Sequence, residues 1–211
     1  MSESLSTSSR QSVHDHILDV ADEQFRLHGI RSVRMDDLAA LLGISKRTLY
    51  QEFADKEAVL VAVSSRNKLA MEEMFRNYAQ ESDNVLEVML KMLRFSFSKI
   101  ATINPKYFEE MHRYPQFKEE VEKSKDIHKE HMRSFLNRGI EQGIFRDSMN
   151  VDLFLDVQQL MQDHAVHALT QKYGAVETLR NSMLTAIRGI STQKGIEMID
   201  TFLEETRNKK N

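Results

Sequence analysis

The chain of 211 residues contains no cysteine, only 2 prolines and only 7 glycines, and each shortage narrows the possible structures. Without cysteine there can be no disulfide, no cysteine-ligated iron-sulfur cluster and no thiol catalysis. The scarcity of proline and glycine, together with helical spacing of apolar residues nearly throughout, favours an all-α fold. Hydrophobic residues make up 41% of the chain, which is enough for a proper core in one or two domains.

Long apolar runs and a surplus of either charge are also missing. No stretch approaches the roughly 20 apolar residues that span a bilayer, and the serine-rich start lacks the hydrophobic segment of a signal peptide. We therefore expect a cytoplasmic protein with no membrane partner. The net charge of −3 is unlike that of a non-specific nucleic-acid binder, so any DNA binding must depend on a local basic patch.

Motifs for catalysis and cofactor binding are absent as well. There is no GxSxG elbow, no phosphate-binding loop, no glycine-rich dinucleotide turn and no HExxH, so we expect neither an enzyme nor a bound cofactor. Two histidine pairs, His128 with His131 and His164 with His167, have the spacing of metal ligands on one helix face. Further ligands are not evident, so solvated or hydrogen-bonded histidines explain both pairs better than a metal.

The most informative segment is 35–53, MDDLAALLGISKRTLYQEF. Leu38 and Leu42 share one face of a predicted helix, and Gly43 gives the backbone the freedom to leave it. Ser45 can then cap a second helix. A short helix, a glycine-containing turn and a second helix form the helix-turn-helix pattern, in which the second helix enters the major groove of DNA.

The second helix of this segment has two different sides. Leu49 and Phe53 are four residues apart and are expected to anchor it to the domain. On the other side, Arg and Lys suit guanine or phosphate, Gln suits adenine, Thr suits a thymine methyl and Tyr suits a phosphate oxygen. The residues on that side are Lys46, Arg47, Thr48, Tyr50 and Gln51. An amphipathic helix hairpin with a solvated polar face is the alternative interpretation of the segment alone.

A helix on each side of the segment favours the DNA-binding interpretation. Upstream, apolar residues recur every four positions from Val13 to Phe25, Ser12 and Asp15 suit a capping box, and Gly29 suits the helix end.

Downstream, Asp55 can cap a helix that begins at Lys56. The positive start of that helix is suited to holding a phosphate.

Residues 13–60 resemble the DNA-binding domain of the TetR family of bacterial transcription regulators. The resemblance runs through the LAALLGIS turn, the TLYQEF recognition helix and the DKEAVL start of the next helix. It implies a homodimer that reads a palindromic double-stranded DNA operator. The DNA contacts that it implies, with Arg34 replacing a usual hydroxyl contact, are Arg34, Ser45, Lys46, Arg47, Thr48, Tyr50, Gln51 and Lys56.

Two positions depart from the family pattern. Val33 and Arg34 precede Met35 where a hydroxyl residue usually caps the helix, so the cap needs another partner. Glu52 occupies a position of the recognition helix where an aromatic or imidazole ring is common. A carboxylate near phosphate is unfavourable unless it accepts from a cytosine amino group or pairs with a cation.

Helical spacing covers the rest of the chain. We expect helices at 56–80, 85–102, 107–112, 116–139, 151–174 and 176–188, followed by a last helix that Thr192 caps. Gly174 is expected to end the helix over 151–174, and Gly189 is expected to break the helix over 176–188.

We expect a flexible tail at 1–10, a helix-turn-helix domain at 11–56 and a regulatory and dimerisation domain at 57–211. In the family the penultimate long helices form the dimer interface, although the same apolar faces could instead fill the monomer core. The candidate interface residues are Met161, Ala165, Ala168, Met183, Ala186 and Ile187. Residues that could line an apolar effector pocket, unless they are simply core, are Met92, Phe95, Phe108, His112 and Met132.

The sequence thus predicts an all-α protein with a three-helix, helix-turn-helix DNA-binding domain followed by a helical-bundle ligand-binding and dimerisation domain. The expected function is a ligand-responsive transcription regulator, a repressor that a small apolar or amphipathic effector releases from its operator. The alternative is a helical module that binds a small molecule or a protein but not DNA. An enzyme is a more distant third.

Overall fold

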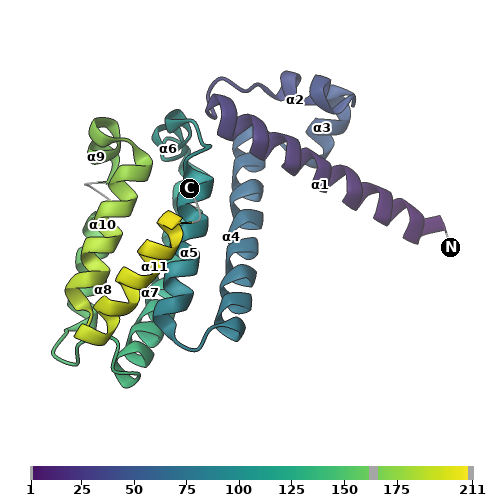
Figure 1. The fold of residues 1–211 in the computed structure, drawn as a ribbon. Helices are drawn as coiled ribbons and strands as arrows, with labels where there is room; N and C mark the ends of the chain where they lie inside the picture. Colours follow the sequence, from purple (N-terminus) through teal and green to yellow (C-terminus); the bar gives the residue numbers. More distant parts are fainter. Residues whose placement is uncertain (1, 162–165, 209–211) are drawn as a thin grey trace. The chain divides into compact units, whose positions relative to one another are not determined.

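The computed structural model describes residues 2–161 and 166–208, and it describes side chains for 12–161 and 169–205. The described residues form helices joined by short loops, with no β-strand among them (Figure 1). The chain divides into two compact units. The first unit comprises Met1–Met71 and Thr102–Lys123, and the second comprises Glu72–Ala101 and Ser124–Asn211.

The helices follow the predicted order. Those of the N-terminal part are α1 (Ser2–His28), α2 (Met35–Leu42), α3 (Lys46–Glu52), α4 (Lys56–Glu81), α5 (Val85–Ile100) and α6 (Pro105–Met111). The remaining ones are α7 (Pro115–Glu141), α8 (Val151–Leu160), α9 (Val166–Tyr173), α10 (Ala175–Ile190) and α11 (Gln193–Asn208).

The core of the first unit forms where the sequence pattern placed it. Ile17, Ala21 and Phe25 are fully buried on one face of α1, and they pack with Leu38 of α2 and Leu49 of α3. The four-residue spacing on α1 places these side chains on one stripe, which the helix buries against its neighbours. The apolar face predicted for the helix upstream of the helix-turn-helix is therefore confirmed as part of this core.

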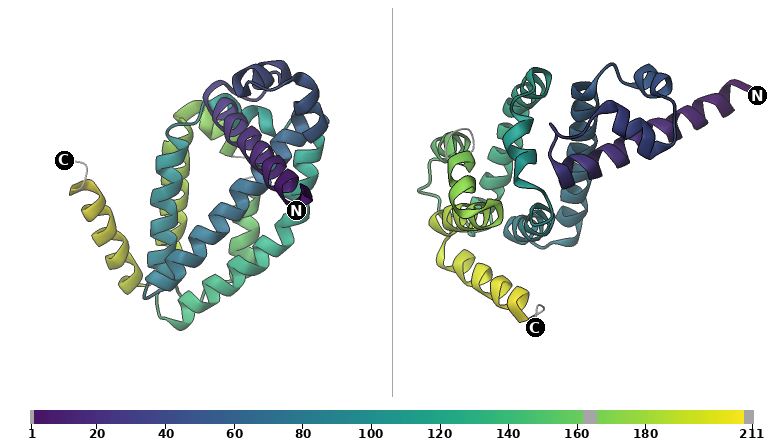
Figure 2. Two further views of the ribbon diagram at one scale, coloured as in Figure 1. Left: turned by 90° about the vertical axis from the view of Figure 1, so that its right-hand side faces the viewer. Right: turned by 90° about the horizontal axis from the view of Figure 1, so that it is seen from above.

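Helix α1 also crosses α4, as Figures 1 and 2 show, and polar contacts join the two. Arg66 Nη1 donates to Asp19 Oδ1 at 2.7 Å, and Asn67 Nδ2 donates to Asp22 Oδ1 at 3.0 Å. The first half of α4 is consequently part of the first unit.

Helix α6 belongs to the first unit, although we expected the DNA-binding domain to end at residue 56. Asn104 caps α6 and Pro105 begins it, two residues before the expected start at 107. Asn104 Oδ1 accepts from Lys106 N at 3.0 Å, and proline at the first helical position needs no hydrogen-bond partner. Asn104 N also donates to Arg26 O at 2.7 Å, which fastens the start of α6 to the end of α1.

The second unit has its own core, built from α5, α7, α10 and α11. Leu86 of α5, Leu136 of α7 and Ile199 of α11 are almost completely buried in it. Thr192 closes the junction before α11, because its Oγ1 accepts from Gly195 N at 3.3 Å. The predicted cap at Thr192 is confirmed.

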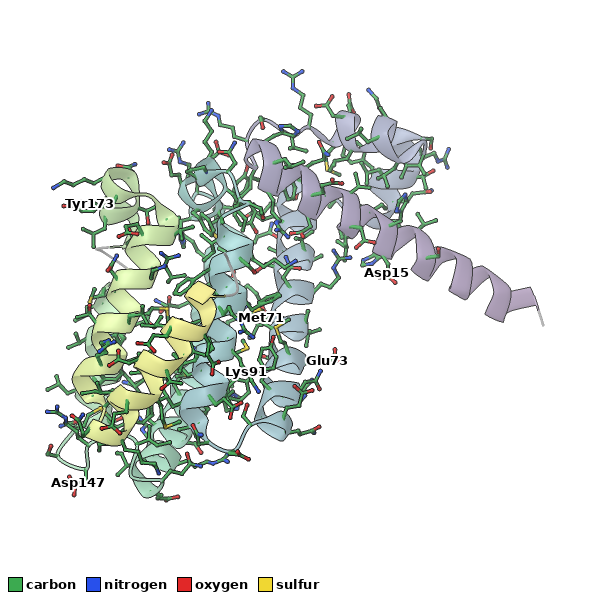
Figure 3. The ribbon with its side chains drawn as sticks, in the orientation of Figure 1. Asp15, Met71, Glu73, Lys91, Asp147 and Tyr173 are labelled. Atoms are coloured by element: carbon green, nitrogen blue, oxygen red, sulfur yellow. The ribbon has the colours of Figure 1, made fainter. Side chains whose placement is uncertain are left out.

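Figure 3 labels Met71 and Glu73 on α4, on either side of the boundary between the units. The chain passes from one unit to the other within α4, between α5 and α6, and within α7.

Two expected helix ends were wrong, and one further expected helix includes residues outside the described part of the chain. Helix α1 extends back to Ser2 through the segment expected as a tail, so Ser12 and Asp15 lie within the helix and do not begin it. Helix α10 continues through Gly189 to Ile190, because a single helical glycine costs only about 1 kcal/mol. The helix expected over 151–174 is described as α8 and α9, with residues 162–165 outside the described part of the chain.

A pair of glycine substitutions tests the packing of the second unit. A Cβ at Gly139 of α7 would overlap the Phe145 ring and lie 2.9 Å from Val85 Cγ2, whereas a Cβ at Gly189 meets nothing within 4 Å. We expect Gly139→Ala to lower the free energy of unfolding by about 1–3 kcal/mol through overpacking. Gly189→Ala is expected to raise it by about 0.5–1 kcal/mol through helix propensity. Equal effects of the two changes in urea unfolding would contradict the described packing.

Candidate nucleic-acid interface

The turn between α2 and α3 has the geometry that its sequence predicts. Gly43 adopts a left-handed conformation with φ of 65°, which glycine tolerates without strain. Its N–H donates to Ala40 O at 3.2 Å, and the next N–H, of Ile44, donates to Ala39 O at 3.1 Å. These two bonds satisfy the end of α2 and direct the chain into α3.

Helix α3 begins at the predicted cap. Ser45 Oγ accepts from Thr48 N at 3.0 Å, and the Ser45 and Thr48 hydroxyls lie 2.8 Å apart. Both hydroxyls are therefore engaged in starting the helix. Either can still contact a phosphate oxygen, because a hydroxyl both donates and accepts.

The two sides of α3 separate as expected. Leu49 is fully buried and Phe53 is 6% exposed, which fixes the inner side of the helix. Arg47, Tyr50 and Gln51 are exposed, and Tyr50 retains half of its accessible surface. The structure therefore brings the polar residues of the recognition helix together on one accessible side.

Lys46 is also exposed, but it has a partner within the unit. Its ammonium forms an ion pair with the Asp36 carboxylate in the first turn of α2. The hydrogen bond that Lys46 donates to this carboxylate raises the pKa of Lys46. Because the pair is exposed, its net free energy is small and a phosphate can compete for the lysine.

Arg34 lies at the N-cap of α2, where the family pattern has a hydroxyl. Arginine has no acceptor on its side chain, so it cannot cap the helix. Asp37 supplies the reciprocal bond instead, since its Oδ2 accepts from Arg34 N at 3.3 Å. The exposed Arg34 guanidinium is therefore not needed for the cap.

Lys56 is held inside the unit. Its Nζ donates to Ile30 O at 2.9 Å, Arg31 O at 3.3 Å and Val33 O at 2.9 Å. The predicted cap before it is confirmed, because Asp55 Oδ1 accepts from Ala58 N at 2.9 Å. Partial burial lowers the pKa of Lys56, and the neighbouring Arg31 lowers it further, while Glu110 acts in the opposite direction.

Sequence reasoning missed two neighbours of this region. The His14 ring of α1 packs against Phe53 at the end of α3, with ring centroids 4.9 Å apart. Glu110 of α6 accepts from Arg31 N at 2.6 Å. No local pattern indicates either contact, because both join residues that are far apart in the sequence.

The five candidate effector-binding residues are divided between the two units. Phe108 and His112 belong to the first unit, where Phe108 packs on the core and His112 is exposed. The other three belong to the second unit and are partly buried there, namely Met92, Phe95 and Met132. None of the five lines the groove at Gln158 and Met161 or the hollow at Gln24 and His28.

The candidate dimer residues also separate. Met161 and Ala186 line an open groove of about 610 Å³ between α8, α9 and α10. Figure 1 draws these three helices in green. Ile187 is 4% exposed and packs in the core of the second unit, as the monomer-core alternative predicted, and Met183 is partly buried against that core. Ala165 lies outside the described residues, as does the side chain of Ala168.

The groove between α8, α9 and α10 borders exposed apolar side chains. Leu153, Val157 and Leu160 form a stripe along α8 and are 60%, 44% and 59% exposed. Tyr173, labelled at the end of α9 in Figure 3, lines the groove and is 54% exposed. Thr178 of α10 also lines it, and its buried Oγ1 has no hydrogen-bond partner.

Two further structural findings concern metal and membrane binding. In the part of the chain that the structure describes, no three histidine, aspartate or glutamate side chains are placed to hold a metal ion. His128 and His131 are exposed on α7, while His164 and the side chain of His167 lie outside the described part. None of the described helices combines the length and apolar character that crossing a membrane requires.

Comparison with known proteins agrees with the geometry of this unit. Residues 17–63 match the family model described as bacterial regulatory proteins, tetR family. The uncharacterized HTH-type transcriptional regulator YvaF of Bacillus subtilis is 44% identical over 63 residues, which are 29% of this chain and 33% of that protein. The HTH-type transcriptional repressor KstR2 of Mycobacterium tuberculosis is 28% identical over 143 residues, 65% of this chain and 71% of that protein.

Solved structures extend the likeness beyond the DNA-binding unit. The structure of a TetR-family transcriptional regulator from Agrobacterium tumefaciens covers 87% of this chain and all of its own, with 18% identity and a TM-score of 0.69. The structure of KstR2 covers 85% of this chain and 95% of its own, with 21% identity and a TM-score of 0.56. At these identities the structures show a shared fold.

The fold and the outward-facing polar side of α3 thus define a helix-turn-helix unit followed by a helical bundle. Through residues 17–63 of its N-terminal unit the chain is similar to the TetR family of bacterial transcription regulators. The chain spans only a quarter to a third of the length of the first curated relatives that it matches.

Proposed function

We propose that the protein is a ligand-responsive transcriptional repressor that binds a palindromic operator as a homodimer. The observation that carries this proposal is the exposure of Arg47, Tyr50 and Gln51 on a helix whose opposite side is buried through Leu49. Such side chains can reach base edges and phosphates when the helix lies in the major groove. Arg34, Ser45, Lys46 and Thr48 would add contacts to the groove wall.

The surface formed by the α8 stripe and the adjoining groove supports a homodimer. Exposed apolar side chains such as Leu153, Val157 and Leu160 lose unfavourable contact with water when a second copy covers them. We retain Met161 and Ala186 as interface residues, whereas Ile187 is assigned to the monomer core.

Dimerisation would give the binding site its symmetry. Two recognition helices must reach half-sites about 34 Å apart, roughly one turn of DNA. Helices α4 and α7 run through both units, so a change in the second unit can be transmitted along the chain to the first. An effector that prefers one arrangement would weaken operator binding, and by linkage the operator would weaken effector binding by the same factor.

The effector is proposed to be small and apolar or amphipathic. Met92, Phe95 and Met132 remain candidates for contacting it within the second unit, because methionine and aromatic side chains adapt to apolar ligands. Similar regulators are described as a ketosteroid regulator and a fatty acid degradation regulator, which is consistent with this class.

A gel-shift titration with the DNA upstream of the protein's own gene tests the proposal. We expect a discrete complex that survives a large excess of random-sequence DNA. Failure to retard either DNA at low ionic strength would instead favour a helical binding module without DNA binding.

A further inference from the structure

The loop at 29–34 joins α1 to α2, and two of its residues are buried. Ile30 is fully buried and Val33 is 5% exposed, although neither lies in a helix. Buried carbonyl groups outside regular secondary structure need other hydrogen-bond partners, because an unsatisfied one is costly. The loop leads directly into α2, so its position sets where α2 and then α3 begin.

Lys56 donates hydrogen bonds to backbone carbonyl groups of this loop. A lysine ammonium has three N–H donors, and all three have acceptors here, namely the carbonyls of Ile30, Arg31 and Val33. A phosphate contact by Lys56 would therefore break at least one bond to the loop. This arrangement differs from that of Arg47, whose side chain lies exposed on α3.

Glu110 of α6 holds the loop through one backbone amide. Its Oε2 accepts from Arg31 N at 2.6 Å, a short bond of the charge-assisted kind. Gly29 allows α6 this close, because a Cβ there would lie 3.0 Å from Lys106 Cβ and 3.1 Å from Glu110 Oε2. Gly29 also has a φ of +82°, which other residues rarely adopt.

We infer that Lys56 and Glu110 are positioning residues that clamp the 29–34 loop between α4 and α6 and so set the placement of the recognition helix. In this inference, which rests on the proposed DNA-binding function, Lys56 is not one of the phosphate contacts. The lysine binds loop carbonyls while the glutamate binds a loop amide, so the two residues restrain the same short segment through opposite kinds of hydrogen bond.

The test uses Lys56→Met and Glu110→Leu in the full chain, with Lys68→Met and Glu109→Leu as matched controls on the same helices. Hydrogen exchange of the Arg31 amide is measured without DNA, and affinity is measured over a range of salt for a duplex that the wild-type protein selects from a random pool. We expect both clamp variants to speed Arg31 exchange and to lower affinity for the duplex by about tenfold, since buried groups lose their partners.

The salt dependence separates a clamp from a phosphate contact. A clamp leaves the slope of affinity against salt unchanged in Lys56→Met, whereas loss of a phosphate contact reduces that slope by about one. A reduced slope with unchanged Arg31 exchange would overturn the inference, as would Glu110→Leu behaving like its control. If the wild-type protein selects no duplex, the proposed function fails, while the exchange measurement still tests the clamp.

Discussion

Replacing Arg47 with alanine is expected to reduce the preference of the protein for operator over random DNA by about 10- to 100-fold. A bidentate contact between arginine and guanine contributes about 1–3 kcal/mol of discrimination. The exposed Arg47 side chain makes no ion pair or hydrogen bond within the described part of the chain that would restrain it. Gln51→Ala should act in the same direction through loss of an adenine contact. The measurement is competitive binding of the selected duplex against random-sequence DNA.

Arg47→Lys provides the matched control for this prediction. Lysine keeps the positive charge but loses the planar, bidentate geometry, so affinity for random DNA should be preserved while discrimination falls. If Arg47→Ala lowers affinity for both DNAs equally, Arg47 contacts phosphate and does not read a base.

Replacing Val157 with glutamate is expected to weaken self-association by about a hundredfold or more, because burying an unpaired carboxylate costs several kcal/mol. Val157 lies in the exposed stripe of α8 and is 44% exposed, so the change should leave the folded monomer intact. Operator binding should fall with the loss of the dimer. Sedimentation equilibrium, together with binding to the selected duplex, measures both effects.

Ile127→Glu is the control for the α8 surface. Ile127 lies on α7 in the same unit and is 61% exposed, so it offers the same chemistry away from the stripe. An intact dimer in Val157→Glu, or equal dissociation in Ile127→Glu, would place the interface elsewhere.

The helix-turn-helix could be predicted because its determinants are local. Gly43, Ser45 and Leu49 lie within seven positions of one another, and each acts through the backbone or packing of its own segment. Once Leu49 identifies the buried side of α3, the outward side follows from helical geometry. The polar side chains of the recognition helix could therefore be placed before any coordinates were known.

The role of α6 could not be predicted because its contacts are long-range. Arg31 and Glu110 are 79 positions apart, and nothing in the sequence around Glu110 distinguishes it from Glu109. The same applies to Lys56, whose loop partners lie 23–26 positions before it. A lysine at a helix start suggests a phosphate site, but only the fold reveals the carbonyls that occupy it.

The effector residues were the least predictable part. Methionine and phenylalanine at helical spacing fit a core as well as a pocket, and sequence cannot say which space stays open. The sequence also does not show which residues share a unit. Phe108 belongs to the first unit and Phe95 to the second, although only 13 positions separate them.

Methylation interference on the selected duplex tests the central claim most directly, because methylating guanine N7 blocks the edge that Arg47 is proposed to contact. We expect two clusters of interfering guanines, related by symmetry and about one helical turn apart. Binding that tolerates methylation at every guanine, or interference confined to one cluster, would contradict a dimer that reads the major groove through paired α3 helices.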